Sequence, residues 1–151
     1  MRLSLVVLAL ALVVAHPAPS EAQRCDRQCL GDFITTYLDA MLAHDPERLH
    51  VSSRLRFTED TTEMKLGQGL WKTATALRPY RQDFLDVREG VAGTHTVVEE
   101  DGSPVLLALR LKVFGLALSE VETMVVRNRQ EGVLFQPDAF TKPNAGMAYV
   151  P

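Results

Sequence analysis

The sequence has little of what marks several protein classes. It holds 2 cysteines, 1 tryptophan and 7% aromatic residues, and its 9 glycines and 8 prolines follow no period, which excludes a collagen-like chain. Basic residues number 16 against 19 acidic ones, so the net charge of -3 gives no reason to expect nucleic acid as a partner. By contrast, 46% of the 151 residues are apolar, which is enough for the core of one globular domain.

The longest apolar run lies at the N-terminus and is too short to cross a bilayer. It extends almost unbroken from Leu3 to Ala15, whereas a membrane span needs about 20 residues. Small residues at Ser20 and Ala22 suit a cleavage site, so residues 1–22 are predicted to be a signal peptide. We therefore expect a secreted or periplasmic protein with no stable membrane insertion after cleavage; a retained anchor is the alternative.

The two cysteines, Cys25 and Cys29, follow this segment directly. In an oxidising compartment such a pair tends to form a disulfide. Residues i and i+4 of a helix hold their Cβ atoms about 5–6 Å apart, whereas a disulfide prefers about 3.8 Å, so the bond requires a non-helical first turn. We predict this disulfide, with free thiols as the alternative. A metal site is not expected, because no second pair of ligands is present.

Apolar spacing predicts helices first and strands afterwards. Residues 26–44 carry apolar side chains at intervals of three and four, which is typical of an amphipathic helix, and Asp45-Pro46-Glu47 begins a second, short one. Alternation predicts strands at residues 55–59, 64–66, 80–85, 94–100, 105–113 and 118–127. The last four strands are joined by short turns, among them Asp101-Gly102, and must form an antiparallel meander.

This order predicts an α+β fold, in which a curved antiparallel sheet carries the N-terminal helices on its concave face. The domain is expected to span residues 23–129. Residues 130–151 contain proline and glycine without an apolar period, and we expect them to form a weakly ordered tail.

Several short blocks, taken in order, resemble a known superfamily. They are Arg56-Phe57-Thr58-Glu59-Asp60, Gly67-x-Gly69-Leu70-Trp71-x-Thr73, Leu109-Arg110-Leu111-Lys112-Val113 and Glu120-Val121-Glu122. Together with the element order they are similar to the nuclear-transport-factor-like cone fold, SnoaL-like branch, and within it to a secreted family of unknown function. The resemblance implies a cone-shaped barrel with a pocket between sheet and helices. Because the superfamily holds isomerases, dehydratases, cyclases and non-catalytic binding or dimerisation modules, the fold alone does not select a function.

The resemblance also implies a catalytic carboxylate at the end of the first strand. In isomerases of the superfamily a carboxylate there is the general base and a helix tyrosine polarises the substrate; the matching residues are Glu59 or Asp60, and Tyr37. Aromatic neighbours would desolvate the carboxylate and raise its pKa toward a useful range. The expected pocket walls are Phe57, Trp71 and Phe84, with Arg81 as a second oxyanion partner. Alternatively, both acidic side chains only face solvent or cap a turn and have no catalytic role.

The direction of Glu122 depends on the register of the last hairpin. If Val113 pairs with Leu118, Glu122 falls opposite Leu109 and lines the pocket. A slip of one residue instead places Glu122 opposite Arg110, as an outward ion pair. We include Glu122 among the pocket-lining candidates and leave the second register open.

The remaining reactive side chains give weaker signals. His95 lies in the predicted sheet and could transfer protons, although an isolated sheet histidine is more often a surface residue. His44 and His50 do not have the spacing of zinc ligands, and Ser103 lacks a nucleophile motif. No metal or cofactor is therefore expected.

The sequence as a whole predicts an exported domain with an apolar pocket for a small hydrophobic molecule. If the protein is an enzyme, the expected reaction is a cofactor-free isomerisation, dehydration or cyclisation. The alternative is a non-catalytic binding or dimerisation module. A homodimer would use the open face of the sheet, although Arg110 and Lys112 predict a polar outer face.

Overall fold

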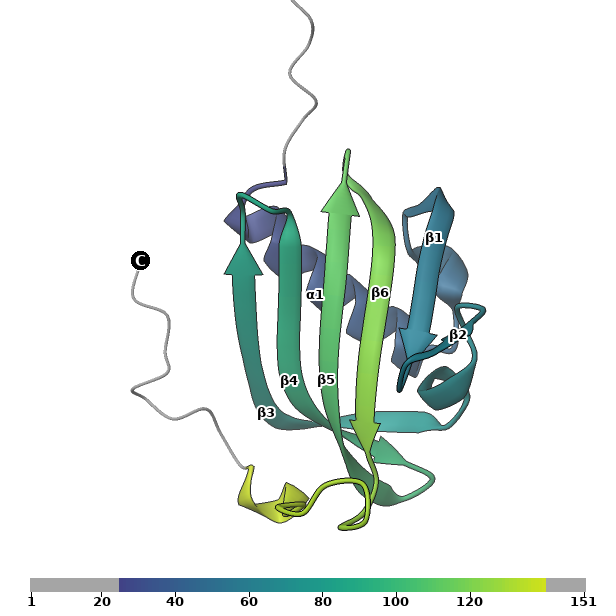
Figure 1. Ribbon diagram of the computed structural model, residues 1–151, viewed down its shortest axis with the longest axis vertical. Coiled ribbons are helices and arrows are strands. Elements are labelled where there is room, and N and C mark those ends of the chain that lie inside the picture. The colour runs from purple at the N-terminus through teal and green to yellow at the C-terminus, as the bar shows by residue number, and fades with distance from the viewer. Residues whose placement is uncertain (1–24, 141–151) are drawn as a thin grey trace, which may run out of the picture.

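The computed structural model describes residues 25–140. Within them, one α-helix, α1 (Arg27–Leu42), lies diagonally across one face of a six-stranded sheet (Figure 1). The strands are β1 (Val51–Glu59), β2 (Thr62–Met64), β3 (Ala74–Asp86), β4 (Val91–Glu100), β5 (Ser103–Phe114) and β6 (Ala117–Val126). The predicted signal peptide, and residues 141–151 of the predicted tail, lie outside the described residues.

Helix α1 begins where a side chain can cap it. The Asp26 carboxylate accepts a hydrogen bond from the Cys29 backbone N–H at 2.9 Å, which satisfies one of the free donors of the first turn. Cys25 lies before the first helical residue and forms the predicted disulfide with Cys29. The non-helical start that the bond requires is thus supplied by the capping residue. No helix within residues 25–140 is long and apolar enough to span a membrane.

The sheet has the strand order β2-β1-β6-β5-β4-β3. Strands β3 to β6 form the predicted antiparallel meander. The sheet is nevertheless mixed, because β1 pairs with β6 in parallel. After β2 the chain crosses to the far edge of the sheet, and the meander then brings β6 back beside β1. The α+β fold is as predicted, but the wholly antiparallel sheet is wrong at this one pairing.

Further elements differ from the sequence prediction, and β1 begins four residues before the predicted residue 55. The second helix is only a 3-10 turn, η1 (Pro46–Arg48), so a single α-helix covers the sheet. Strand β3 begins six residues earlier than the predicted residue 80, because two irregularities in its pairing with β4 interrupt the alternation of apolar residues. The early half of β3 runs across the lower end of the sheet in Figure 1.

The predicted turn at Asp101-Gly102 has positive φ at both residues, 48° and 81°, as a two-residue hairpin of this kind requires. Beyond β6, the chain passes through turns to a short 3-10 helix, η3 (Pro137–Ala139). Phe140 then packs edge-on against Tyr80, with ring centroids 4.9 Å apart. This segment lies at the lower end of the sheet (Figure 1).

We call the side of the sheet that packs against α1 the inner face and the opposite side the outer face. Strand β5 shows the division, because Leu107, Leu109 and Leu111 are buried on the inner face whereas Ala108 and Arg110 alternate with them on the outer face. Most of the hydrophobic core is therefore a layer between α1 and the sheet.

Candidate functional site

The end of β1 carries the carboxylate that the sequence proposed as a base. Alternation places Phe57 and Glu59 on the inner face, as predicted, and both are buried, with exposed fractions of 2% and 6%. Tyr37 from α1 and Trp71 from the 3-10 helix η2 (Gly69–Lys72) are also fully buried in this layer. The structure thus brings four of the predicted site residues into the core.

The side chains of Tyr37 and Trp71 contact each other. The Trp71 indole N–H donates a hydrogen bond to the Tyr37 hydroxyl oxygen at 2.8 Å, and the rings meet edge to face at 5.2 Å. Burial raises the pKa of Tyr37 far above its ordinary value, and the negative charge of Glu59 raises it further. Tyr37 is therefore a neutral phenol packed against Trp71, whose backbone carbonyl in turn contacts the His44 ring at 2.5 Å.

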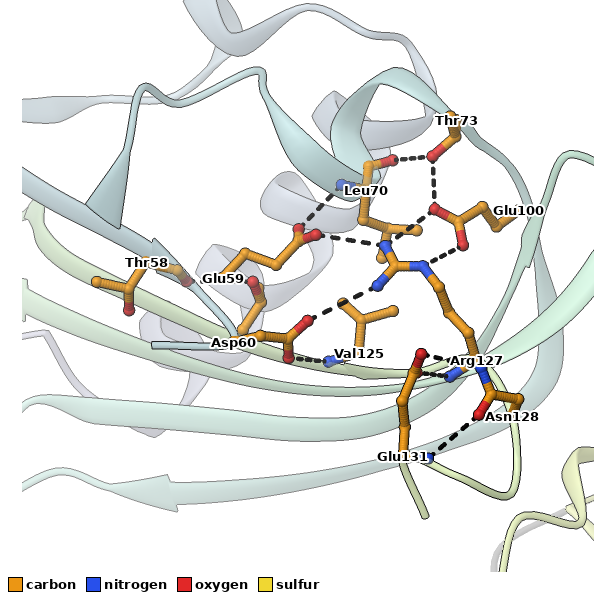
Figure 2. A network of polar contacts seen from close by, with 11 residues as sticks. Thr58, Glu59, Asp60, Leu70, Thr73, Glu100, Val125, Arg127, Asn128 and Glu131 are labelled. Atoms are coloured by element: carbon orange, nitrogen blue, oxygen red, sulfur yellow. Dashed lines mark hydrogen bonds and ion pairs between the residues drawn. The ribbon is translucent and has the colours of Figure 1, made fainter. Parts of the chain in front are cut away.

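Both oxygens of Glu59 have partners (Figure 2). Oε2 accepts a hydrogen bond from the Leu70 backbone N–H at 2.9 Å, and Oε1 accepts one from the Arg127 guanidinium at 3.3 Å. Gly69 makes room for this contact: a Cβ atom at that position would lie 2.5 Å from Glu59 Oε2. The hydrogen bond from Leu70 thus holds η2 against the end of β1.

Arg127 connects three carboxylates. It donates to Glu100 at 2.6 Å and 3.0 Å, contacts Glu59, and lies 3.7 Å from Asp60 (Figure 2). Thr73 donates a further hydrogen bond to Glu100 at 2.7 Å. The bonds from Arg127 hold the pKa of Glu100 below its usual range, and Glu100 in turn raises the pKa of Arg127. We call Glu59, Glu100 and Arg127 the inner polar network.

Asp60 belongs to the β1–β2 turn rather than to the inner face. Its Oδ1 accepts a hydrogen bond from the Val125 backbone N–H at 2.9 Å, and its φ of 48° is left-handed. Within residues 25–140 no group of three or more histidine, cysteine or acidic side chains is placed to hold a metal ion.

Sequence reasoning missed Arg127, Glu100 and Thr73. Glu59, Glu100 and Arg127 each lie at or next to the end of a strand, in β1, β4 and β6 respectively. Those ends share one edge of the sheet because β1 is parallel to β6, and β4 and β6 are both antiparallel to β5. The sequence pattern did not indicate that β1 pairs with β6 in parallel, so it could not predict that these three residues meet.

Two predicted site residues, Arg81 and Phe84, lie away from Glu59. Arg81 is bonded to Asp83 and to Thr35 of α1. Phe84 lies on the outer face, 47% exposed, with its ring edge-on to His95 at 5.2 Å. The structure therefore does not bring either residue to Glu59.

The prediction that Glu122 lines a pocket is wrong. Val113 does pair with Leu118, but a register shift after Lys112 moves the rest of the hairpin by one residue. Glu122 then lies opposite Arg110 on the outer face, with its carboxylate 3.5 Å from the guanidinium. The outward ion pair is the alternative that the structure supports.

A cavity of about 210 Å³ opens on the outer face, at the lower end of the sheet. Its lining includes Tyr80, His95, Leu106, Ala108, Met124, Val126 and Phe140. His95, Ala108 and Met124 are neighbours across β4, β5 and β6, and Leu106 pairs with Val126 in the next row. We call this cavity the outer pocket; sequence reasoning did not find it, because its residues lie on four strands and the segment after β6.

Three solved structures share the fold of this chain. A de novo designed protein with a curved β-sheet aligns with a TM-score of 0.57 at 13% identity, covering 72% of this chain and 93% of that chain. The de novo designed NTF2 fold protein NT-9 aligns at 0.50 with 10% identity, covering 74% and 95%. The BvnE pinacolase from Penicillium brevicompactum aligns at 0.52 with 15% identity, covering 78% and 92%.

Neither a family model nor a curated protein matches the sequence. The chain has the NTF2-like, or SnoaL-like, α+β cone fold, as the sequence resemblance predicted. At such low identities the likeness establishes the fold alone.

Proposed function

We propose that the protein binds a small apolar molecule in the outer pocket. The observation that carries the proposal is a concave, largely apolar cavity of about 210 Å³ on the outer face of the sheet. Apolar cavities of about 150 Å³ are large enough for benzene. Met124 lies at the rim with 63% of its surface exposed, so burying it under a ligand would be favourable.

The inner polar network is better suited to holding the fold than to catalysis. A general base must reach the proton that it removes, at about 2.6–3.2 Å. Glu59 is 6% exposed, and its two oxygens are bonded to Leu70 and Arg127. Freeing Oε2 would leave the buried Leu70 N–H unpaired, at a cost of about 1–3 kcal/mol. We therefore propose a structural role for Glu59 and Tyr37.

The fold is compatible with this proposal. BvnE is a pinacolase of the same fold, but its active-site chemistry does not transfer at 15% identity. We also propose that the protein is exported, on two grounds: the character of residues 1–22 and the Cys25–Cys29 disulfide.

The binding proposal is tested with toluene, followed by NMR of the backbone amides. Toluene should shift the resonances of His95, Ala108 and Met124, which line the pocket in one row. Ala108→Phe fills the cavity and should weaken toluene binding at least tenfold. Ala117→Phe places the same ring on β6 away from the pocket and should change the affinity less than twofold.

Two results would overturn the proposal. One is the absence of any saturable shift in the folded protein. The other is a set of shifts centred on Trp71 and Glu59, which would place the ligand on the inner face and restore the catalytic interpretation of that carboxylate.

A further inference from the structure

We infer that the outer pocket selects a neutral ligand that carries one hydrogen-bonding group, and that His95 is the residue that recognises this group. The inference rests on the proposed function, because it names the class of ligand for the same pocket. It depends on which polar groups at the pocket already have partners and on the charges around the rim.

The hydroxyl donors of the other polar side chains in the lining are already used. The Tyr80 hydroxyl donates to the Gln82 side-chain oxygen at 3.1 Å. The Thr96 hydroxyl donates to the Tyr80 backbone carbonyl at 2.8 Å. Neither donor is therefore available to a ligand without breaking an existing bond.

His95 differs from both. It is exposed, and its ring contacts Phe84 edge-on. Within the described part of the chain its ring nitrogens have no hydrogen-bond partner. A neutral imidazole has one N–H donor and one acceptor nitrogen, so it can pair with a hydroxyl or a carbonyl. Its neighbour in the row, Ala108, has only a methyl group and leaves space beside the ring.

The charges near the pocket oppose an anionic ligand. On one side of the pocket, Arg110 and Glu122 lie two residues along their strands from Ala108 and Met124. The Arg110 guanidinium lies 2.9 Å from the Glu120 carboxylate and 3.5 Å from that of Glu122. The single guanidinium of this group is already paired with two carboxylates. A ligand carboxylate brought to the pocket would lose its hydration and find this guanidinium already occupied.

The second group repeats this arrangement at the other side of the pocket, where Asp138 lies two residues before Phe140. Arg78 lies 2.5 Å from Glu99 and 2.6 Å from Asp138. Because every carboxylate of the two groups already has a guanidinium partner, a ligand ammonium would lose its hydration and find no unpaired anion. A neutral ligand has neither penalty.

The test compares four probes that share one ring: toluene, p-cresol, p-toluate and 4-methylbenzylamine. In the full-length protein at pH 8, p-cresol should bind about threefold to tenfold more tightly than toluene, as one net hydrogen bond allows. The carboxylate and the amine should each bind more weakly than p-cresol. The side-chain nitrogen resonances of His95 should move further with p-cresol than with toluene.

Variants of His95 separate recognition from packing. His95→Phe keeps an aromatic ring against Phe84 and should reduce the preference for p-cresol over toluene at least threefold. His95→Gln restores a donor and an acceptor and should recover part of that preference. Because both variants change the lining of the pocket, toluene affinity is measured in each variant and the preference is taken as the ratio of the two affinities.

The outcomes distinguish the two proposals. Failure of toluene to bind would overturn the proposed function and this inference with it. If toluene binds in the outer pocket but the preference for p-cresol is absent, or is unchanged in His95→Phe, only the inference is wrong. Tighter binding of p-toluate or 4-methylbenzylamine than of p-cresol would also overturn it.

Discussion

On the inner face of the sheet, Phe57, Tyr37 and Trp71 are each no more than 2% exposed, whereas on the outer face Phe84 is 47% and Met124 63% exposed. Carboxylates follow the same division. Glu59 on the inner face has a side-chain exposure of 7% and two bonded oxygens, and Glu122 on the outer face has an exposure of 49% and one loose ion pair. The two faces thus use the same residue types differently.

The comparison indicates that the inner face stabilises the fold, whereas the outer face is available for ligand recognition. Burial of a carboxylate is tolerated on the inner face only because hydrogen bonds and a guanidinium satisfy it. Groups used in this way cannot also bind a ligand. The outer face contributes less to folding and keeps an unpaired imidazole beside an apolar cavity. The predictions below test this division, beginning with the largest effect.

Removing one large aromatic side chain from each face should give very different losses of stability. Trp71→Ala deletes a fully buried ring and the hydrogen bond to Tyr37, and should lower the free energy of unfolding by about 3–5 kcal/mol. Phe84→Ala on the outer face should lower it by less than about 1 kcal/mol. Urea unfolding followed by circular dichroism measures both. Equal losses would contradict the division between the faces.

Two glycines with similar backbone conformations isolate the contact with Glu59. Gly69 and Gly115 have φ of 64° and 55°, so alanine costs each about 1 kcal/mol from the left-handed backbone. At Gly69 the added Cβ would also meet the Glu59 carboxylate at 2.5 Å, whereas at Gly115 it meets open space. We expect Gly69→Ala to lower the free energy of unfolding by about 2–4 kcal/mol, and Gly115→Ala by about 1 kcal/mol.

The inner polar network should also lose its effect in acid. Arg127 lowers the pKa of Glu100 in the folded protein, so the stabilisation is complete above the unfolded-state pKa and is lost as the pH falls through the lower folded-state value. Arg127→Met should therefore lower the free energy of unfolding by about 1–2 kcal/mol at pH 7. The difference from the unmodified protein should shrink below about pH 4.5.

An exposed arginine provides the control for this pH dependence. Arg56 pairs with Glu63, and both side chains are more than 60% exposed, at 63% and 69%. Arg56→Met should change the free energy of unfolding by less than about 0.5 kcal/mol at any pH between 3 and 8, an estimate for exposed pairs. A loss for Arg127→Met that is the same at pH 3 and pH 7 would show that the guanidinium acts by packing alone.

Local patterns in the sequence were sufficient to predict much of the fold. The apolar stripe of α1, the Asp101-Gly102 turn and the shared face of Phe57 and Glu59 all follow from spacing within a few residues. The Cys25–Cys29 disulfide was predicted as well, because the geometry allowed it once the helix begins after Cys25. Each of these features depends on a short segment of chain.

Features that join distant segments could not be predicted in this way. Arg127 meets Glu59 only because β1 and β6 are parallel, and no local signal specifies which strand returns beside β1. Phe84 reaches the outer face after an irregular stretch of β3 that interrupts strand alternation. The outer pocket requires Phe140 to pack against Tyr80, sixty residues earlier in the sequence. Site residues that only the strand topology brings together could therefore not be predicted from the sequence.

The register of the last hairpin offers the smallest and most specific test. With the observed register, Arg110 faces Glu122 and lies within 3.5 Å of its carboxylate. A double-mutant cycle of Arg110→Ala and Glu122→Ala should therefore give a coupling free energy of about 0.2–1 kcal/mol that decreases in 1 M salt. The cycle of Lys72→Ala with Glu122→Ala should give none, because Lys72 belongs to η2, which packs on the inner face, whereas Glu122 lies on the outer face.

A coupling of zero for Arg110 and Glu122 would favour the other register, in which Glu122 faces the core opposite Leu109. In that case Glu122→Ala alone would remove an unpaired carboxylate from an apolar environment and should raise the free energy of unfolding. Because the two registers place this side chain on opposite faces, one cycle decides whether the outer face keeps the two carboxylates beside Arg110. Because Arg110 is paired in this register, it offers no free guanidinium to an anionic ligand at the outer pocket.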